Sequence, residues 1–261
     1  EPALLMNYGL DLFNNSEVEK ALEQLQRAAE AMEQMDPKVV LPEVRERLVN
    51  TYASILMQAE EQETLINFAQ SKLSLASGPT ATVHYLYGLA LLKSNRSTEA
   101  ITQLQACIDK ADAPTLAPGC PGVNQAAPHH LIADCLTRDG RAEEAEEHYC
   151  QAVLTEPGNP GPRHDYARFL AAHNRAPEAI ELLHEFLGEG TPNEHLWALG
   201  CNIVNTHLAD SQIADEWTET AALHYPENED IIKHRAIALL TAGKFEGALE
   251  LFEKEPSSDD I

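Results

Sequence analysis

Small and large apolar residues recur along the chain about every 34 residues, and each period holds two helix-like stretches joined by a turn. The clearest copy covers 126–159, with pattern positions at Ile132, Ala133, Leu136, Ala145, Tyr149, Ala152 and Pro157. The copy that starts at Pro160 repeats them at Tyr166, Ala167, Leu170, Ala179, Leu183 and Phe186. Small residues at the eighth and twentieth positions let two helices approach closely, while large apolar residues fill the space around the contact. The pattern therefore predicts helical hairpins that bury a core only by stacking on one another.

The same pattern returns toward the end of the chain. Spacings of 34, 35 and 34 residues separate Ala145, Ala179, Ala214 and Ala248. This period, with the order large-x2-Leu-Gly-x2-Tyr, Ala-x3-Phe and Pro, resembles the tetratricopeptide repeat (TPR) family. The resemblance implies an all-α fold, a right-handed superhelical solenoid of about seven TPR-like helix-turn-helix repeats.

We expect a single array over 1–254, with repeats near 2–35, 40–76, 81–111, 126–159, 160–190, 193–228 and 229–254. The distance from Ala100 to Ala145 is 45 residues, 11 more than one period, and the surplus falls in 111–125. Prolines and glycines forbid a regular helix there, so this segment is an expected insertion loop, and 255–261 is an expected frayed tail. In the first hairpin, Ser16 followed by Glu19 predicts a capping box at the start of the second helix.

Composition narrows the range of partners. The formal net charge is −24, which disfavours nucleic acid and anionic membrane surfaces. No apolar run approaches the roughly 20 residues that span a bilayer, so no membrane insertion is expected. The five cysteines have no short paired spacing, which suits reduced thiols and a cytoplasmic location.

No catalytic pattern stands out in the sequence, which lacks a phosphate-binding glycine loop, His-Glu-x-x-His, Cys-x-x-Cys and Gly-x-Ser-x-Gly. The best metal candidate combines Cys120, His129, His130 and Cys135, but its spacing matches no closed zinc site. The acidic run at 143–147 falls in the first turns of a helix, where carboxylates favour the helix dipole and solvent. We therefore expect a chain that is not an enzyme, with no cofactor and no metal.

In the TPR family, the first helix of each repeat lines the concave face and contacts ligands. Carried onto this sequence, the resemblance places these residues on that face: Tyr85, Lys93, His130, Asp134, Arg138, His164, Arg168, Trp197 and Lys233. Arginines and an aromatic side chain there suit an acidic or extended peptide. The Lys and Asn clamp of the chaperone-tail binders is absent, since its places hold Met6 and Leu10, Tyr85 and Leu89, or His130 and Asp134.

The first helix is apolar where an end cap should be polar, and Met6, Leu10 and Phe13 are expected to project from it. Self-association through apolar terminal repeats is therefore one hypothesis. The layout of 2–154 also resembles the C-terminal TPR region of bacterial family-2 glycosyltransferases, which implies a catalytic domain outside this chain. Two functions remain open: a scaffold that binds a protein or peptide on its concave face, and an accessory region of a glycosyltransferase.

Overall fold

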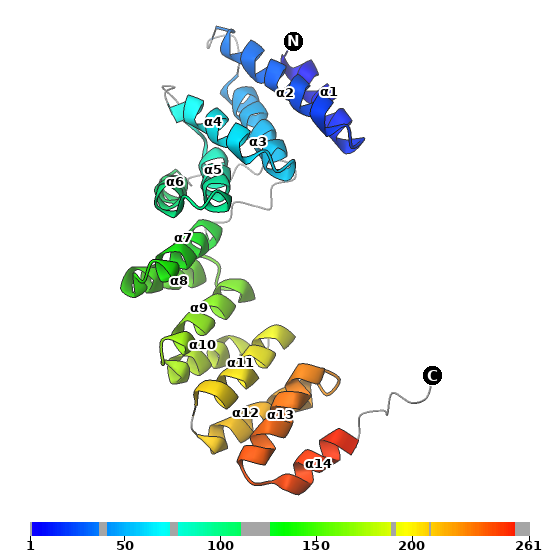
Figure 1. Cartoon of the computed structure of the whole chain (residues 1–261), viewed down its shortest axis with the longest axis vertical. Helices are drawn as coiled ribbons and strands as arrows, with labels where there is room; N and C mark the ends of the chain where they lie inside the picture. Colours follow the sequence, from blue (N-terminus) through cyan, green and yellow to red (C-terminus); the bar gives the residue numbers. More distant parts are fainter. Residues whose placement is uncertain are drawn as a thin grey trace. The chain divides into compact units, whose positions relative to one another are not determined.

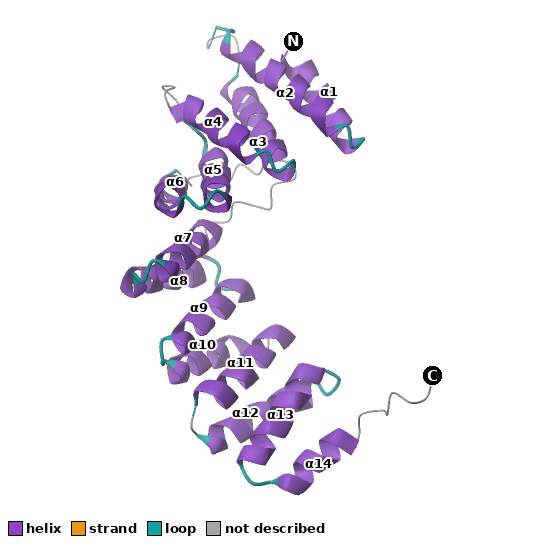
Figure 2. Cartoon of the chain, viewed as in Figure 1, coloured by secondary structure: helices purple, strands orange, loops and turns teal. Residues whose placement is uncertain are grey.

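The computed structural model describes residues 2–36, 41–73, 78–110, 126–188, 192–208 and 210–253, and its regular elements there are all α-helices (Figure 2). The helices are α1 (Pro2–Asn14), α2 (Val18–Glu33), α3 (Pro42–Gln58), α4 (Gln62–Leu73), α5 (Ala81–Lys93), α6 (Ser97–Asp109), α7 (Ala126–Arg138), α8 (Ala142–Thr155), α9 (Pro160–Ala172), α10 (Ala176–Gly188), α11 (Glu194–His207), α12 (Ser211–His224), α13 (Glu229–Thr241) and α14 (Phe245–Glu253). They form sequential pairs (Figure 1), so the predicted all-α solenoid of about seven helix-turn-helix repeats is confirmed. The predicted insertion loop at 111–125 and tail at 255–261 lie outside the described residues.

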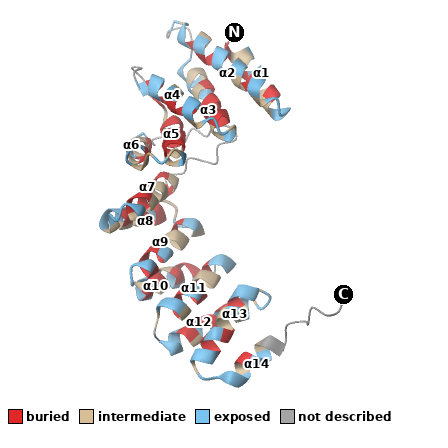
Figure 3. Cartoon of the chain, viewed as in Figure 1, coloured by how far each residue is buried: buried red, intermediate tan, exposed pale blue. Residues whose placement is uncertain are grey.

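The chain divides into two compact units, Glu1–Ala152 and Val153–Ile261. In the first unit, α1 packs on α2, α3 on α4, and α5 on α6. In the second unit, α9 packs on α10, α11 on α12, and α13 on α14. In both units the helices carry buried positions beside exposed ones (Figure 3), and the buried apolar residues form the core. Each unit thus buries its core by stacking hairpins, as the sequence pattern requires.

Glycine allows a close helix approach in the first and third hairpins. A Cβ atom at Gly9 would lie 2.8 Å from Cγ of Leu25, and one at Gly88 would lie 2.8 Å from Cγ of Leu104. Both leucines are fully buried. Their side chains therefore occupy the space that a larger residue at the eighth position would need.

The turns inside the hairpins share one backbone geometry. Ser16, Asn95 and Asn174 have φ near +60°, and Gly140 and Gly243 have φ near +75°. This left-handed conformation lets the next backbone N–H donate to a carbonyl of the preceding helix, as from Glu17 to Leu12 at 2.9 Å. The predicted capping box at Ser16 is wrong, because Ser16 forms this turn and α2 begins after Glu17 with no side-chain cap.

The terminal hairpins do expose apolar residues, although they differ from those expected at the start of the chain. The prediction that Met6 projects from the first helix is wrong, because this residue is only 3% exposed. Leu4 and Tyr8 of α1 are exposed instead. In the last hairpin the exposed apolar residues are Ile237, Leu240, Phe245 and Leu249. Self-association through the terminal repeats remains a prediction. None of the described helices has the length and apolar character needed to cross a membrane.

Candidate functional site

In the first unit, three of the predicted ligand-facing residues form a ladder along one face of α7. His130, Asp134 and Arg138 are four residues apart, so their side chains follow one another on the helix surface. Asp134 Oδ2 lies 3.9 Å from Nε2 of His130 and 3.8 Å from a guanidinium nitrogen of Arg138. The Tyr149 hydroxyl of α8 donates to Asp134 Oδ1 at 2.8 Å. Asp134 is therefore fixed in place, while the Arg138 side chain remains 70% exposed.

The other two predicted residues of this unit stand on α5 and differ in what they offer to a ligand. Tyr85 is only 8% exposed and belongs to the packed core. Lys93 ends α5 and is exposed. A partner that approaches α5 can therefore reach the ammonium group of Lys93 but little of the Tyr85 ring.

In the second unit, the predicted residues on α9 and α13 are accessible charged or polar groups. His164 Nδ1 lies 3.1 Å from a carboxylate oxygen of Asp165, and Arg168 is exposed one turn further along α9. Lys233 on α13 is exposed and lies 3.4 Å from Glu229 and 3.8 Å from Asp230. The contacts of His164 and Lys233 lie within single helices at the surface, so they leave these side chains available for exchange with a ligand carboxylate.

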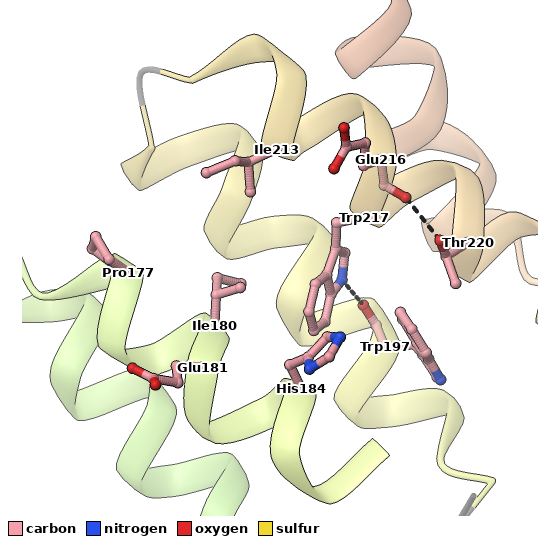
Figure 4. A pocket seen from close by; sticks show the side chains of 9 residues that line it. All are labelled: Pro177, Ile180, Glu181, His184, Trp197, Ile213, Glu216, Trp217 and Thr220. Carbon is pink, nitrogen blue, oxygen red and sulfur yellow. Dashed lines mark hydrogen bonds between the residues drawn. The ribbon is translucent and has the colours of Figure 1, made fainter. Parts of the chain in front are cut away.

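Trp197 lies apart from these residues, against the second helix of its own hairpin. Its ring centroid is 5.0 Å from that of Trp217 and 5.5 Å from that of His224, both on α12. The indole N–H of Trp217 donates to the Trp197 carbonyl at 3.4 Å. The two tryptophans border a pocket of about 420 Å³ between α10 and α12 (Figure 4). Its lining consists of Pro177, Ile180, Glu181, His184, Trp197, Ile213, Glu216, Trp217 and Thr220.

A glycine positions the wall of this pocket. A Cβ atom at Gly200 would lie 2.3 Å from the Trp217 ring, so only glycine lets the indole lie directly on α11. The first and third hairpins carry leucine four residues after the small residue at the twentieth position. The sixth hairpin has the smaller Thr218 at this place. Sequence reasoning missed the pocket. The pair Trp217 and Thr218 does indicate that a different side chain packs on the first helix in this hairpin.

A partly buried charged cluster joins α12 to α13, and sequence reasoning missed it as well. Asp215 accepts from Arg235 at 2.6 Å and from Lys244 at 2.6 Å, and the side chains of Asp215 and Arg235 are 15% and 12% exposed. The hydrogen bond from Lys244, and then that from Arg235, lowers the pKa of Asp215 below its ordinary value. This cluster stabilises the hairpin stack, and its three residues are not among those that line the pocket beside the two tryptophans.

The residues considered for zinc make other contacts. His129 and His148 approach through their Nδ1 atoms at 2.9 Å, and burial together with the neighbouring His148 lowers the pKa of His129 to about 4. Cys135 is buried, and burial raises the pKa of its thiol. Cys120 lies outside the described residues. Across the described part of the chain, no group of three or more His, Cys, Asp or Glu side chains could hold a metal ion.

The comparisons with known proteins agree with this architecture. The model of the tetratricopeptide repeat family matches residues 125–200. Residues 125–200 are therefore tetratricopeptide repeats, and the other hairpins share their helix-turn-helix architecture. No curated protein sequence matches this TPR protein.

Solved structures resemble the TPR protein in fold at low sequence identity. The C-terminal part of a TPR repeat-containing protein from Cytophaga hutchinsonii has a TM-score of 0.70 at 14% identity, over 97% of this chain and 96% of that chain. PilF of Pseudomonas aeruginosa has a TM-score of 0.57 at 16% identity, over 90% and 96%. YrrB, described as a TPR protein with an unusual peptide-binding site, has a TM-score of 0.55 at 14% identity, over 80% and 96%. TPR proteins in general mediate protein–protein interactions.

Proposed function

We propose that this TPR protein is a non-catalytic scaffold that binds a protein or peptide through the first helices of its repeats, the face expected to be concave. The observation that carries the proposal is the placement of exposed arginines on those helices in a chain of net charge −24. Arg138 ends α7 and Arg168 lies on α9, and both are exposed. An exposed arginine can form a bidentate contact with a carboxylate of the partner.

Binding in this proposal adds weak contacts over the hairpins within each unit. In the first unit, Arg138 reaches the partner, while Asp134 is held by Tyr149 and sets the position of the arginine from one turn away. In the second unit, Arg168 supplies the corresponding contact, and Lys233 adds a further cation on α13.

Charge reversal tests the proposal. Peptides selected from a random displayed library on the wild-type chain should favour acidic residues, and their affinity should be measured by calorimetry. We expect Arg138→Glu and Arg168→Glu each to weaken binding by about tenfold, because an exposed charge-assisted contact is lost and a repulsion replaces it.

Arg27→Glu is the matched control, since Arg27 is an exposed arginine on α2, the second helix of its repeat. It makes the same change in net charge away from the proposed face, so the affinity should remain at the wild-type level. Equal weakening by all three substitutions would reduce the effect to long-range repulsion, and unchanged affinity in the Arg138 and Arg168 variants would refute the proposed face.

The accessory region of a glycosyltransferase is the alternative function. The exposed Leu4 and Tyr8 on α1 favour a contact between this helix and another domain. In that case the TPR protein would position an acceptor or mediate association for a catalytic domain. A reading frame that encodes a sheet-forming catalytic domain upstream of Glu1 would support this function, and a start codon close to Glu1 would count against it.

We also propose a reducing compartment such as the cytoplasm. Cys107, Cys135, Cys150 and Cys201 are free thiols, and burial raises the pKa of Cys107 to about 11 and that of Cys201 to about 12. Thiols that remain protonated and buried are poor nucleophiles and poor disulfide partners.

A further inference from the structure

The pocket between α10 and α12 lies mainly on second helices of the repeats, which the proposed function does not use. Eight of its nine lining residues come from the second helices of two successive repeats, and Trp197 comes from α11. Arg168 and Lys233, by contrast, stand on the first helices α9 and α13. A ligand in this pocket would therefore contact mainly second helices, whereas the peptide proposed above contacts first helices.

The two walls of the pocket have matching geometry. The lining residues of α10 are Pro177, Ile180, Glu181 and His184, and those of α12 are Ile213, Glu216, Trp217 and Thr220. Each set has the spacing i, i+3, i+4 and i+7, which is one face of a helix, and extends about 10 Å along the axis. Two helix faces with such ridges leave a groove of the shape that a third helix fills.

The floor of the groove is apolar and aromatic. Figure 4 shows Ile180 and His184 of α10 turned toward the Trp217 ring, and the His184 ring centroid lies 6.4 Å from that of Trp217. Ile213 is 40% exposed at the edge of the groove. Leucine-sized or aromatic side chains of a ligand would remove this apolar surface from water.

The charges that border the groove are all negative. Glu181 and Glu216 line it, both are exposed, and no lysine or arginine is among the nine lining residues. Glu216 accepts a hydrogen bond from the Gln212 amide at 2.9 Å, which holds its carboxylate near the groove. An anionic ligand is repelled here, whereas a ligand with lysine or arginine beside its apolar face finds complementary charge.

From this geometry we infer that the groove between α10 and α12 binds a short amphipathic helix of a partner protein, with apolar side chains on the Trp217 floor and basic side chains against Glu181 and Glu216. The partner is recognised by its basic and apolar character. This site is independent of the peptide-binding face proposed for the first helices.

The chain's only two tryptophans, Trp197 and Trp217, both line the groove, so tryptophan fluorescence reports directly on its occupancy. The probe is a synthetic amphipathic helix with leucine on one face and lysine on the other, without tryptophan. A matched peptide carries glutamate in place of lysine. We expect the lysine peptide to shift the tryptophan emission in a saturable manner and to bind at least about tenfold more tightly than the glutamate peptide.

A pair of double variants separates this site from the general attraction of a cationic peptide to an acidic protein. Glu181→Gln with Glu216→Gln should weaken the lysine peptide by about tenfold. Glu23→Gln with Glu185→Gln changes the net charge equally at exposed glutamates outside the groove and should retain the affinity. Thr220→Lys, at an exposed position one turn from Glu216, should also weaken binding and leaves the packed core unaltered.

Equal weakening by both double variants, or binding of the peptide without any change in tryptophan emission, would overturn the inference. Arg138→Glu and Arg168→Glu should leave this binding at the wild-type level. The two sites therefore succeed or fail separately in their tests.

Discussion

The third and sixth hairpins meet the same packing requirement with different side chains. In the first unit, Leu104 of α6 lies on Gly88 of α5 and is fully buried. In the second unit, Trp217 of α12 takes the corresponding place on Gly200 of α11. A leucine fills the space that glycine leaves, but the longer indole also extends to the edge of the hairpin, where it becomes a pocket wall. A binding surface thus arises from a change of packing residue, without any inserted loop.

The two units also treat titratable groups differently. In the first unit, His129 and His148 are half-buried and lie against each other, and burial is the main cause that lowers the pKa of each. In the second unit, Asp215, Arg235 and Lys244 form a charged cluster between α12 and α13. The first unit should therefore lose stability when its histidines become charged, and the second when its carboxylate becomes neutral.

The largest expected effect on the free energy of unfolding is in the third hairpin, where leucine packs on glycine. Leu104→Ala should lower the free energy of unfolding by about 3 kcal/mol, because it removes a fully buried side chain and leaves a cavity beside Gly88. Urea unfolding should be followed by circular dichroism, which reports on all helices, and by tryptophan fluorescence, which reports only on the second unit. The dichroism midpoint should fall more than the fluorescence midpoint. An equal fall in both would mean that the units unfold together and would end the comparison between them.

The next effect concerns the charged cluster of the second unit. Asp215→Ala should cost about 2–3 kcal/mol, because it leaves the largely buried guanidinium of Arg235 without its carboxylate. For this variant the fluorescence midpoint of urea unfolding should fall more than the dichroism midpoint. Glu178→Gln is the control, since Glu178 pairs with Arg175 at the surface, and no measurable change is expected.

The same cluster gives a pH dependence with a definite sign. Because the folded-state pKa of Asp215 lies below its ordinary value of 3.8, its contribution is present above pH 3.8 and is lost as the pH falls through the folded value. Asp215→Asn should therefore reduce stability at neutral pH and flatten this acid limb. An unaltered acid limb in the variant would place the acid sensitivity elsewhere.

The histidine pair predicts an acid sensitivity at higher pH. The pKa of His129 is lowered from 6.5 to about 4. Between these two pH values the unfolded chain therefore binds a proton at this residue that the folded chain does not bind. Stability should fall by about 2 kcal/mol between pH 6.5 and 4 after allowance for partial exposure, and should be insensitive to this group above pH 6.5. His129→Gln should flatten the limb measured by circular dichroism. A limb of wild-type steepness in this variant would show that His129 does not cause it.

The sequence pattern predicted the repeats but not which side chains contact one another. The spacing of Ala145, Ala179, Ala214 and Ala248 predicted the hairpins correctly, because a close helix approach requires small residues at fixed intervals. Ser16 was assigned to a cap because a capping box and a left-handed turn favour the same polar residues. The cluster of Asp215 with Arg235 and Lys244 spans 20 and 29 residues, and a periodic pattern does not encode which charged partners meet across two helices.

Trp197 shows the same limit at the candidate site. The repeat register placed it with Arg168 and Lys233, yet its ring lies on Trp217 and His224. The two halves of this hairpin are two residues out of step with the other repeats, so a position counted from the repeat start no longer fixes the direction of the side chain. The repeat pattern therefore could not predict contacts that depend on the register of the hairpin. It could predict exposed cations on a regular hairpin, such as Arg138.

The smallest expected effect sharpens the comparison most directly. Trp217→Leu gives the sixth hairpin the side chain that lies on glycine in the third, and the free energy of unfolding should fall by about 1–2 kcal/mol, because leucine leaves part of the space of the buried indole empty. The groove should lose its floor, and the lysine peptide should bind far more weakly although the fold is retained. Trp197 remains as the fluorescent reporter. A loss of stability as large as that of Leu104→Ala would mean that Trp217 serves packing first, whereas a small loss of stability with unchanged peptide affinity would mean that the pocket wall is dispensable.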